Sequence, residues 1–190
     1  MSLQVFLTWL SRWLYRSSKH SKPKKKKMQR LSKRFDEDLV FFALTIYGEA
    51  RGECLEGQVA VAYVIRHRLE KWNRYSSYKN TVLDRLQFSC WNRYRIGYGF
   101  ISPYDHNTKV LKKAFENFDE MFDNHKILRQ CVHVADGVMN DMFLDYSKGA
   151  DHYLAKWLYE SDACPSWAKK YKVTTTIGNH IFLRSFMIER

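Results

Sequence analysis

Most patterns that identify a metal, nucleotide or redox protein are missing from this sequence of 190 residues. Its four cysteines include no pair at C-x-x-C spacing, which argues against a zinc ribbon or a thioredoxin-like redox site. Its seven histidines form neither H-x-x-x-H nor H-E-x-x-H, so we expect no metal site. A glycine-rich phosphate loop is also absent, and we expect no cofactor.

Acidic residues are absent from the first 35 residues, which contain 11 lysines and arginines. The remaining 155 residues carry 21 basic and 20 acidic side chains, so nearly all of the net charge of +12 lies on this first segment. A nucleic-acid-binding domain usually builds its basic patch into the folded body. Because the body of this chain is close to neutral, we do not expect a nucleic-acid partner.

Long apolar runs are missing as well. Residues 3–14 place apolar side chains at steps of three and four, as on one face of a helix, but fall far short of the ~20 residues of a membrane span. No signal-peptide cleavage site is evident. A polybasic run at 19–27 follows, and this combination favours an anionic surface such as lipid headgroups. We interpret 1–35 as an amphipathic, polybasic tail whose residues 1–34 bind an anionic membrane surface, or form only a solvated leader.

Residues 36–190 form one predicted domain, because 45% of the chain is hydrophobic and its length suffices for a single core. We expect this domain to be a monomer. Asp36 suits a helix cap, and apolar residues then recur with helical period over 39–46. Continuing that period reaches Glu49 and then Glu53. Both carboxylates therefore align with a buried face, where a charge is costly without a purpose.

Glu49 is expected near the carboxyl end of this helix, because Gly48 and Gly52 loosen the helix around it. The helix dipole and partial burial both oppose a negative charge there, and so favour the protonated carboxyl that a general acid requires. The spacing alone still favours an ordinary ion pair with Arg51 or another nearby arginine as the explanation of Glu49.

Five sequence blocks, in their order along the chain, resemble the motifs of the SleB-type cell-wall hydrolases. That family includes spore-cortex lytic enzymes and many phage and prophage lysins. The opening block spans residues 46–65 and contains Tyr-Gly-Glu-Ala-Arg-Gly-Glu. The later blocks are QFSCW at 87–91, GADHY at 149–153, PSWA at 165–168 and IGNHIF at 177–182. The resemblance covers roughly residues 36–186, and several blocks in order are more specific than any one of them.

The resemblance implies a fold class and a reaction. The fold is α+β, mainly α: a lysozyme-like (lytic transglycosylase) domain with a small β element, here the cell-wall hydrolase catalytic domain 36–190. The substrate is peptidoglycan, cleaved at the β-1,4 bond between N-acetylmuramic acid and N-acetylglucosamine. The acid of the family matches Glu49, and its second glutamate matches Glu53, for which we expect a supporting, substrate-side role.

Three positions depart from the family pattern. Cys54 stands where family members commonly carry proline, and His67 stands where they carry asparagine. Leu154 replaces a second histidine, which puts in doubt any binding or metal role for that position. None of these differences affects Glu49.

Two of these blocks, at 87–91 and 149–153, supply candidate substrate-binding residues. Phe88 offers an apolar face to a sugar ring, and Gln87 and Ser89 offer hydrogen bonds to N-acetyl groups. His152 and Tyr153 are predicted on the opposite wall, with Tyr153 stacking on a sugar. Alternatively, Phe88 belongs to the core and His152 is an ordinary buried, hydrogen-bonded histidine.

A single-acid mechanism is favoured, because two carboxylates on one helix face cannot readily flank a sugar bond from opposite sides. Glu49 would protonate the glycosidic oxygen and then take the proton of the muramoyl 6-hydroxyl, which closes a 1,6-anhydro ring. Attack by water instead would make the enzyme a lysozyme, and the sequence leaves both outcomes open.

Two rival functions remain at this stage. An N-acetylmuramoyl-L-alanine amidase would need a zinc site or a thiol nucleophile such as Cys90 or Cys164, and the ligand spacing is poor. A membrane- or nucleic-acid-binding protein would act through the basic tail alone. We expect a phage or prophage enzyme that is made in the host cytoplasm and acts at the cell wall or periplasm, with carriage in a virion as an alternative.

Apolar and β-branched patterns elsewhere in the chain predict helices and strands that support the fold. Helices are expected over 104–123 and 132–139, and another helix is expected to end near Leu86. The β-branched run 173–177 predicts a strand that turns at Gly178-Asn179 into a second strand.

Overall fold

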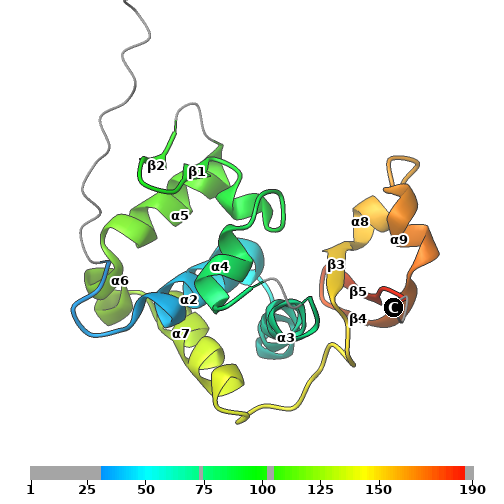
Figure 1. Ribbon diagram of the computed structural model, residues 1–190, viewed down its shortest axis with the longest axis horizontal. Coiled ribbons are helices and arrows are strands. Elements are labelled where there is room, and N and C mark those ends of the chain that lie inside the picture. The colour runs from blue at the N-terminus through cyan, green and yellow to red at the C-terminus, as the bar shows by residue number, and fades with distance from the viewer. Residues whose placement is uncertain (1–30, 73–74, 102–104, 187–190) are drawn as a thin grey trace, which may run out of the picture.

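The computed structural model describes residues 31–72, 75–101 and 105–186. Helices dominate this part of the chain (Figure 1). In chain order they are α2 (Glu37–Ala50), α3 (Leu55–Lys71), α4 (Tyr78–Leu83), the 3-10 helix η1 (Ser89–Trp91), α5 (His106–Glu116), α6 (Phe118–Asn124), α7 (Lys126–Met139), α8 (Lys156–Tyr159) and α9 (Ser166–Lys170).

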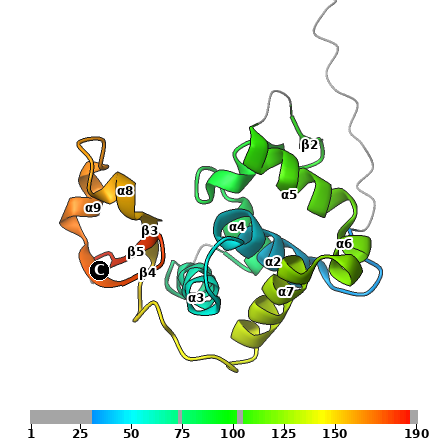
Figure 2. The ribbon, with the colours of Figure 1, turned by 180° about the vertical axis from the view of Figure 1, so that it is seen from behind.

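The strands form two small antiparallel sheets. Strand β1 (Tyr94–Arg95) pairs with β2 (Gly99–Phe100). The second sheet has the order β3-β5-β4 and consists of β3 (His152–Ala155), β5 (His180–Arg184) and β4 (Lys172–Ile177). Together with α8 and α9 this sheet lies at one end of the molecule, and α5 and α6 lie at the other (Figures 1 and 2).

Helix α2 is the centre of the helical part. The Asp36 side chain caps it by accepting a hydrogen bond of 2.9 Å from the backbone N–H of Leu39, as predicted. Every residue from Leu39 to Gly48 is buried, because α3, α4, α5 and α7 surround the helix. A helix that is apolar on all sides belongs in a core, and this one places Glu49 at its carboxyl end.

The predicted β-hairpin is confirmed, and several predicted helix boundaries are wrong. Strands β4 and β5 meet at Gly178, which has a positive φ of 54°. The single helix predicted over 104–123 is two helices, because the backbone breaks at Asn117 with φ −128° and ψ 41°. Helix α4 ends at Leu83, and Leu86 takes a left-handed φ of 64° in the loop that follows.

Apolar packing divides the fold into a large core and a small one. The large core joins α2, α3 and α7 and also includes Phe182 of β5. The small core lies between the sheet and α9 and contains Leu154, Ala168, Ile181 and Leu183. Because Phe182 joins the large core, the sheet is fastened to the helical part.

The described chain begins with a segment that packs on α6. Ser32 Oγ donates to Asp119 Oδ1 at 2.5 Å, and Arg34 forms an ion pair of 2.8 Å with Asp123. Residues 1–30, which carry most of the predicted tail, lie outside the described residues. Within the described part, no helix has the length and apolar character needed to cross a membrane.

Candidate active site

The carboxylate of Glu49 accepts hydrogen bonds from two distant segments of the chain. The backbone N–H of Cys90 donates to Oε1 at 2.8 Å, and Ser89 Oγ donates to the same oxygen at 3.1 Å. The Tyr153 hydroxyl donates to Oε2 at 3.2 Å. Glu49 is half-buried, so a substrate can reach a carboxylate whose orientation these three donors determine.

Helix η1 reaches Glu49 because α2 carries a glycine at the contact. A Cβ added at Gly48 would lie 2.7 Å from the Cβ of Cys90, closer than side chains tolerate. Burial, followed by the negative charge of Glu49, raises the pKa of the Cys90 thiol well above its ordinary value. The thiol therefore stays protonated near neutral pH, which disfavours the thiol nucleophile considered for an amidase.

Tyr153 reaches the same carboxylate from β3, on the sheet side. Its ring packs against His180 at a centroid distance of 5.1 Å and against Phe182 at 6.0 Å. Burial, and then the charge of Glu49, raise the pKa of Tyr153 well above its ordinary value. The phenol therefore keeps its proton near neutral pH and can donate to the carboxylate or accept from the carboxylic acid.

Glu53 stands in a different setting, in the turn that follows α2. Its Oε2 accepts a hydrogen bond of 3.0 Å from the backbone N–H of Asn179, and its Oε1 accepts another of 3.0 Å from Asn179 Nδ2. A Cβ at Gly178 would lie 1.9 Å from Glu53 Oε2, so a larger residue there would displace the Glu53 carboxylate, and the positive φ of 54° also favours glycine. Glu53 thus anchors the β4–β5 turn to the end of α2.

Arg68 belongs to α3 and is buried, with only 5% of its surface exposed. Its Nε donates to the backbone oxygen of Asp151 at 2.7 Å. One terminal nitrogen donates to the backbone oxygen of Gln87 at 3.2 Å and to its Oε1 at 3.3 Å. Burial lowers the pKa of this guanidinium, yet arginine remains charged in proteins.

The two segments that Arg68 holds are those that contact Glu49. Gln87 comes two residues before Ser89, and Asp151 comes two residues before Tyr153. We therefore interpret Arg68 as a positioning residue. The apolar stripe of α3 contains Val61, Val64, Ile65 and then Arg68. A charge on this buried stripe was the available sequence signal, and it was missed.

The structure distributes the six predicted substrate-binding residues over four places. Ser89 and Tyr153 contact Glu49 directly. Gln87 and Phe88 contact Arg68 instead, with the guanidinium carbon 4.8 Å from the Phe88 ring centroid. Phe88 is 2% exposed.

The fifth and sixth predictions have other neighbours. Glu53 binds Asn179, as described above, and His152 Nδ1 lies 2.8 Å from Asp151 Oδ1. The His152 ring packs among three aromatic side chains, those of Trp72, Trp167 and Tyr171.

Asp151 is a buried carboxylate that fixes the start of β3. Its Oδ1 accepts from the backbone N–H of Ser185 at 2.8 Å, and its Oδ2 accepts from Ser185 Oγ at 2.6 Å. Burial alone would raise its pKa, but the hydrogen bonds with His152 and Ser185 outweigh burial and lower the pKa to about 2.

His180 is a further polar group near both glutamates. Its Nδ1 is buried, and it lacks a hydrogen-bond partner within the described chain. Burial lowers the pKa of His180, although the charges of Glu53 and Glu49 act in the opposite direction. Within the described ranges, no three His, Cys, Asp or Glu side chains are grouped so as to hold a metal ion, and this includes His180 and the two glutamates.

Comparisons with known proteins agree with this architecture. A family model described as Cell Wall Hydrolase matches residues 52–183, more than half of the chain, and begins three residues after Glu49. The catalytic domain of the germination-specific lytic transglycosylase SleB from Bacillus anthracis superposes with a TM-score of 0.52 at 20% identity, covering 80% of this chain and 99% of that one.

The SleB catalytic domain from Bacillus cereus gives a TM-score of 0.50 at 20% identity and covers 83% of this chain and 98% of that one. A comparison with curated proteins finds no match. The two structural likenesses confirm the predicted fold class, a mainly helical α+β domain of the lysozyme-like type with a small sheet.

Proposed function

We propose a specific reaction for this chain, which belongs to the cell wall hydrolase family and is a peptidoglycan-degrading enzyme. In this reaction it cuts the glycan strand at the β-1,4 bond between N-acetylmuramic acid and N-acetylglucosamine. Glu49 serves as general acid and then as general base. The observation that carries the proposal is the half-buried Glu49 carboxylate, oriented by hydrogen bonds from η1 and from β3.

The first step is protonation of the leaving group. The carboxylic acid of Glu49 gives its proton to the glycosidic oxygen while the bond from that oxygen to C1 of the muramoyl sugar breaks. The N-acetylglucosamine hydroxyl leaves, and positive charge develops at C1. Tyr153 stays neutral and keeps Glu49 oriented through the transfer, because its hydroxyl can donate or accept a hydrogen bond.

The second step returns the proton. The Glu49 carboxylate takes the proton of the muramoyl 6-hydroxyl, and O6 bonds to C1 to close a 1,6-anhydro ring. Atoms balance without water, so the proposed enzyme is a lytic transglycosylase. Attack of water at C1 would instead give a reducing end, which is the lysozyme outcome.

The environment of Glu53 favours the transglycosylase outcome. Hydrolysing glycosidases commonly use a second carboxylate, either as nucleophile or to activate water. Glu53 is the neighbouring candidate, but both of its oxygens accept hydrogen bonds from Asn179. A scheme that needs only Glu49 fits this arrangement, and we assign Glu53 a positioning role at the β4–β5 turn.

The walls of the proposed sugar groove come from both parts of the fold. We expect Gln87 and Ser89 to line it on the helical side, with Ser89 beside the bond that is cut, whereas Phe88 is buried in the core and supports this segment from below. Tyr153 lines it on the sheet side, whereas His152, its neighbour in β3, points to the opposite face of the sheet and packs against Trp167 and Tyr171. The contacts of Ser89 and Tyr153 with Glu49 support this placement most directly.

Mass spectrometry of the products tests the proposal. Digestion of purified peptidoglycan should release fragments with 1,6-anhydro-muramoyl ends, and Glu49→Gln should lower their release by about 10³-fold or more. Reducing muramoyl ends would replace the transglycosylase by a lysozyme. Free stem peptides with intact glycan strands would mean an amidase and would overturn the proposal.

The place of action follows from the substrate. An enzyme that degrades peptidoglycan acts at the cell wall. We propose that residues 1–34 hold it near an anionic membrane surface on the way to that wall. Phage or prophage origin, synthesis in the host cytoplasm and carriage in a virion stay predictions, as does the monomeric state.

A further inference from the structure

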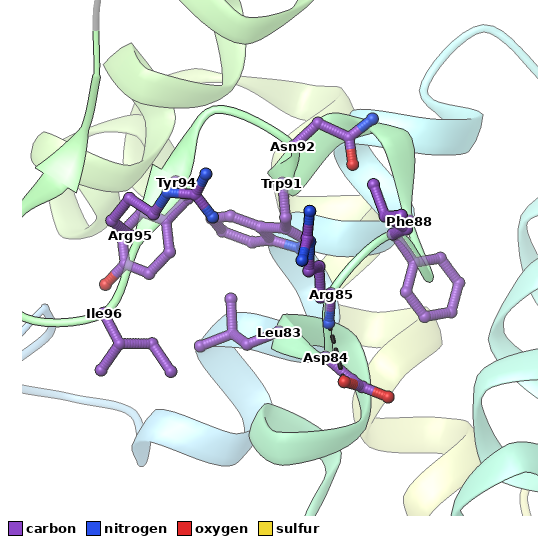
Figure 3. A pocket seen from close by; sticks show the side chains of 10 residues that line it. Leu83, Asp84, Arg85, Phe88, Trp91, Asn92, Tyr94, Arg95 and Ile96 are labelled. Atoms are coloured by element: carbon purple, nitrogen blue, oxygen red, sulfur yellow. Dashed lines mark hydrogen bonds between the residues drawn. The ribbon is translucent and has the colours of Figure 1, made fainter.

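A concave site lies beside the proposed catalytic residue Glu49, on the segment between α4 and β1 (Figure 3). This pocket has a volume of about 290 Å³. Its floor is apolar and rigid, because Phe88, Trp91 and Tyr94 are buried and Trp91 Nε1 donates to Thr45 Oγ1 at 2.9 Å. The reaction proposed above uses neither the pocket nor its rim.

The rim repeats one combination of residues. Arg85 and Leu86 are adjacent in the chain, and so are Arg95 and Ile96; all four line the pocket. Leu86 is 73% exposed and Ile96 is 65% exposed, which is unusual for large aliphatic side chains. Leu86 also has a positive φ of 64°, a strained conformation for a residue of this kind.

The charge of the rim is available to a ligand. Within the described part of the chain, neither Arg85 nor Arg95 forms an ion pair with a carboxylate. Arg93 differs, because the pKa of Asp105 is lowered most by the hydrogen bond from Thr108 and then also by the positive charge of Arg93.

Asp84 also lines the pocket, but its oxygens accept hydrogen bonds from the backbone N–H of Arg85 at 2.8 Å and from the Tyr75 hydroxyl at 2.6 Å. Arginine binds carboxylates through paired N–H donors, so the two arginine side chains of the rim suit a ligand with free carboxylates.

The pocket shares its walls with the segment that holds Glu49. Phe88 and Trp91 line the pocket, and the two residues between them are Ser89 and Cys90, which donate to Glu49. The pocket and the catalytic carboxylate therefore lie on two sides of the same short 3-10 helix.

We propose that this pocket binds the peptide stem of the peptidoglycan strand whose glycan bond Glu49 cuts. The stem is a short peptide attached to the muramoyl sugar, and it carries free carboxylates and small aliphatic side chains. Its carboxylates pair with Arg85 and Arg95, and its aliphatic groups cover Leu86 and Ile96. This assignment rests on the proposed function. It adds a substrate specificity, because the enzyme would prefer glycan strands that still carry their peptide stems.

The reach of the stem is sufficient. An extended peptide spans ~3.3–3.6 Å per residue, so a stem of four residues covers about 13–14 Å. A helix with its side chains is ~10–12 Å across. A stem that starts at the sugar bound beside Glu49 can therefore pass over η1 and enter the pocket.

Binding to insoluble peptidoglycan tests the assignment. The experiment uses the full chain with Glu49→Gln, so that the polymer is not cut, and adds Arg85→Gln and Arg95→Gln together. Intact peptidoglycan should then bind roughly tenfold more weakly, because two charge-assisted contacts are lost. Peptidoglycan whose stems have been removed by an amidase should bind with the same affinity before and after the two substitutions.

Arg93→Gln in the same Glu49→Gln background is the matched control. Arg93 is an exposed arginine of the same segment but does not line the pocket, so its loss should leave binding to both polymers unchanged. Melting temperatures of all variants show that they fold.

Two results would overturn the assignment. Equal loss on intact and stripped polymer would mean that the arginines bind sugar, or bind the wall without selecting stems; no loss on either would mean that the pocket is not used. Failure of the proposed function is read separately, from the absence of anhydro-muramoyl ends with the unsubstituted chain.

Discussion

The end of α2 and the turn after it present two glutamates four residues apart in very different surroundings. Glu49 accepts hydrogen bonds from three residues that belong to η1 and β3. Both carboxylate oxygens of Glu53 accept hydrogen bonds from a single residue, Asn179. Both side chains continue the same apolar period in the sequence. The two carboxylates share a position in the apolar sequence pattern but differ in their hydrogen-bond partners. These partners decide that Glu49 is suited to proton transfer and that Glu53 is suited to anchoring a turn.

The strongest test of this contrast exchanges each carboxylate for an amide. Glu49→Gln should lower cleavage of purified peptidoglycan by about 10³-fold or more, since the amide has no proton to transfer. Glu53→Gln is the matched control and should keep measurable cleavage, because its proposed role is positional. Rates of release of soluble fragments measure both variants. An equal loss of cleavage in Glu49→Gln and Glu53→Gln would mean that both carboxylates are needed for the reaction.

Arg68 tests whether the surroundings of Glu49 depend on one buried cation. Arg68→Met should lower the free energy of unfolding by roughly 2–4 kcal/mol, because it leaves backbone oxygens of Gln87 and Asp151 without their donor. Urea denaturation measures this loss.

The positioning role of Arg68 has a separate readout. Arg68→Lys keeps the charge but loses the fork of donors, so it should restore part of the stability while kcat stays low at an unchanged KM. Arg68→Lys with full kcat would show that Arg68 supports the fold and does not position the site.

Asp151 extends the comparison to a fully buried carboxylate. Its pKa is lowered to about 2, so the ionised form stabilises the fold at any pH above its ordinary value near 3.8. That contribution, on the order of 2 kcal/mol, is lost as the pH falls from about 4 through about 2. The free energy of unfolding should therefore fall less steeply between a pH of about 4 and a pH of about 2 in Asp151→Asn than in the unsubstituted protein. Curves of equal slope would contradict the assignment.

Tyr153 tests the contact between the sheet and Glu49. Tyr153→Phe removes one hydrogen bond to the carboxylate and should lower kcat about tenfold, which corresponds to ~1.4 kcal/mol. The ring remains, so the melting temperature should change little. Unchanged kcat would mean that the donors from η1 orient Glu49 without help from the sheet.

The smallest effect is expected at the turn. Asn179→Ala and Glu53→Gln should each cost about 1 kcal/mol of stability, because their hydrogen bonds are partly exposed. A double-mutant cycle should show that the two losses are not additive. Additive losses would mean that Glu53 has another partner, such as the substrate.

Local patterns in the sequence were sufficient for several elements. The cap at Asp36 and the apolar period predicted α2, and the β-branched run before Gly178 predicted the β4–β5 hairpin. These features depend on backbone neighbours within a few residues, which a sequence displays directly. The ordered blocks also placed the chain in its family, which the match over 52–183 confirms.

Tertiary structure alone decided which side chains meet. The Tyr153 hydroxyl contacts a carboxylate 104 positions earlier, and Glu53 contacts a residue 126 positions later. Such pairs depend on how α3 and the sheet pack around the end of α2, and no local periodicity encodes that packing. The sequence by itself determined that Glu49 ends a buried helix in a cell wall hydrolase. The fold determined that Glu49 has oriented donors and that Glu53 is bound to Asn179.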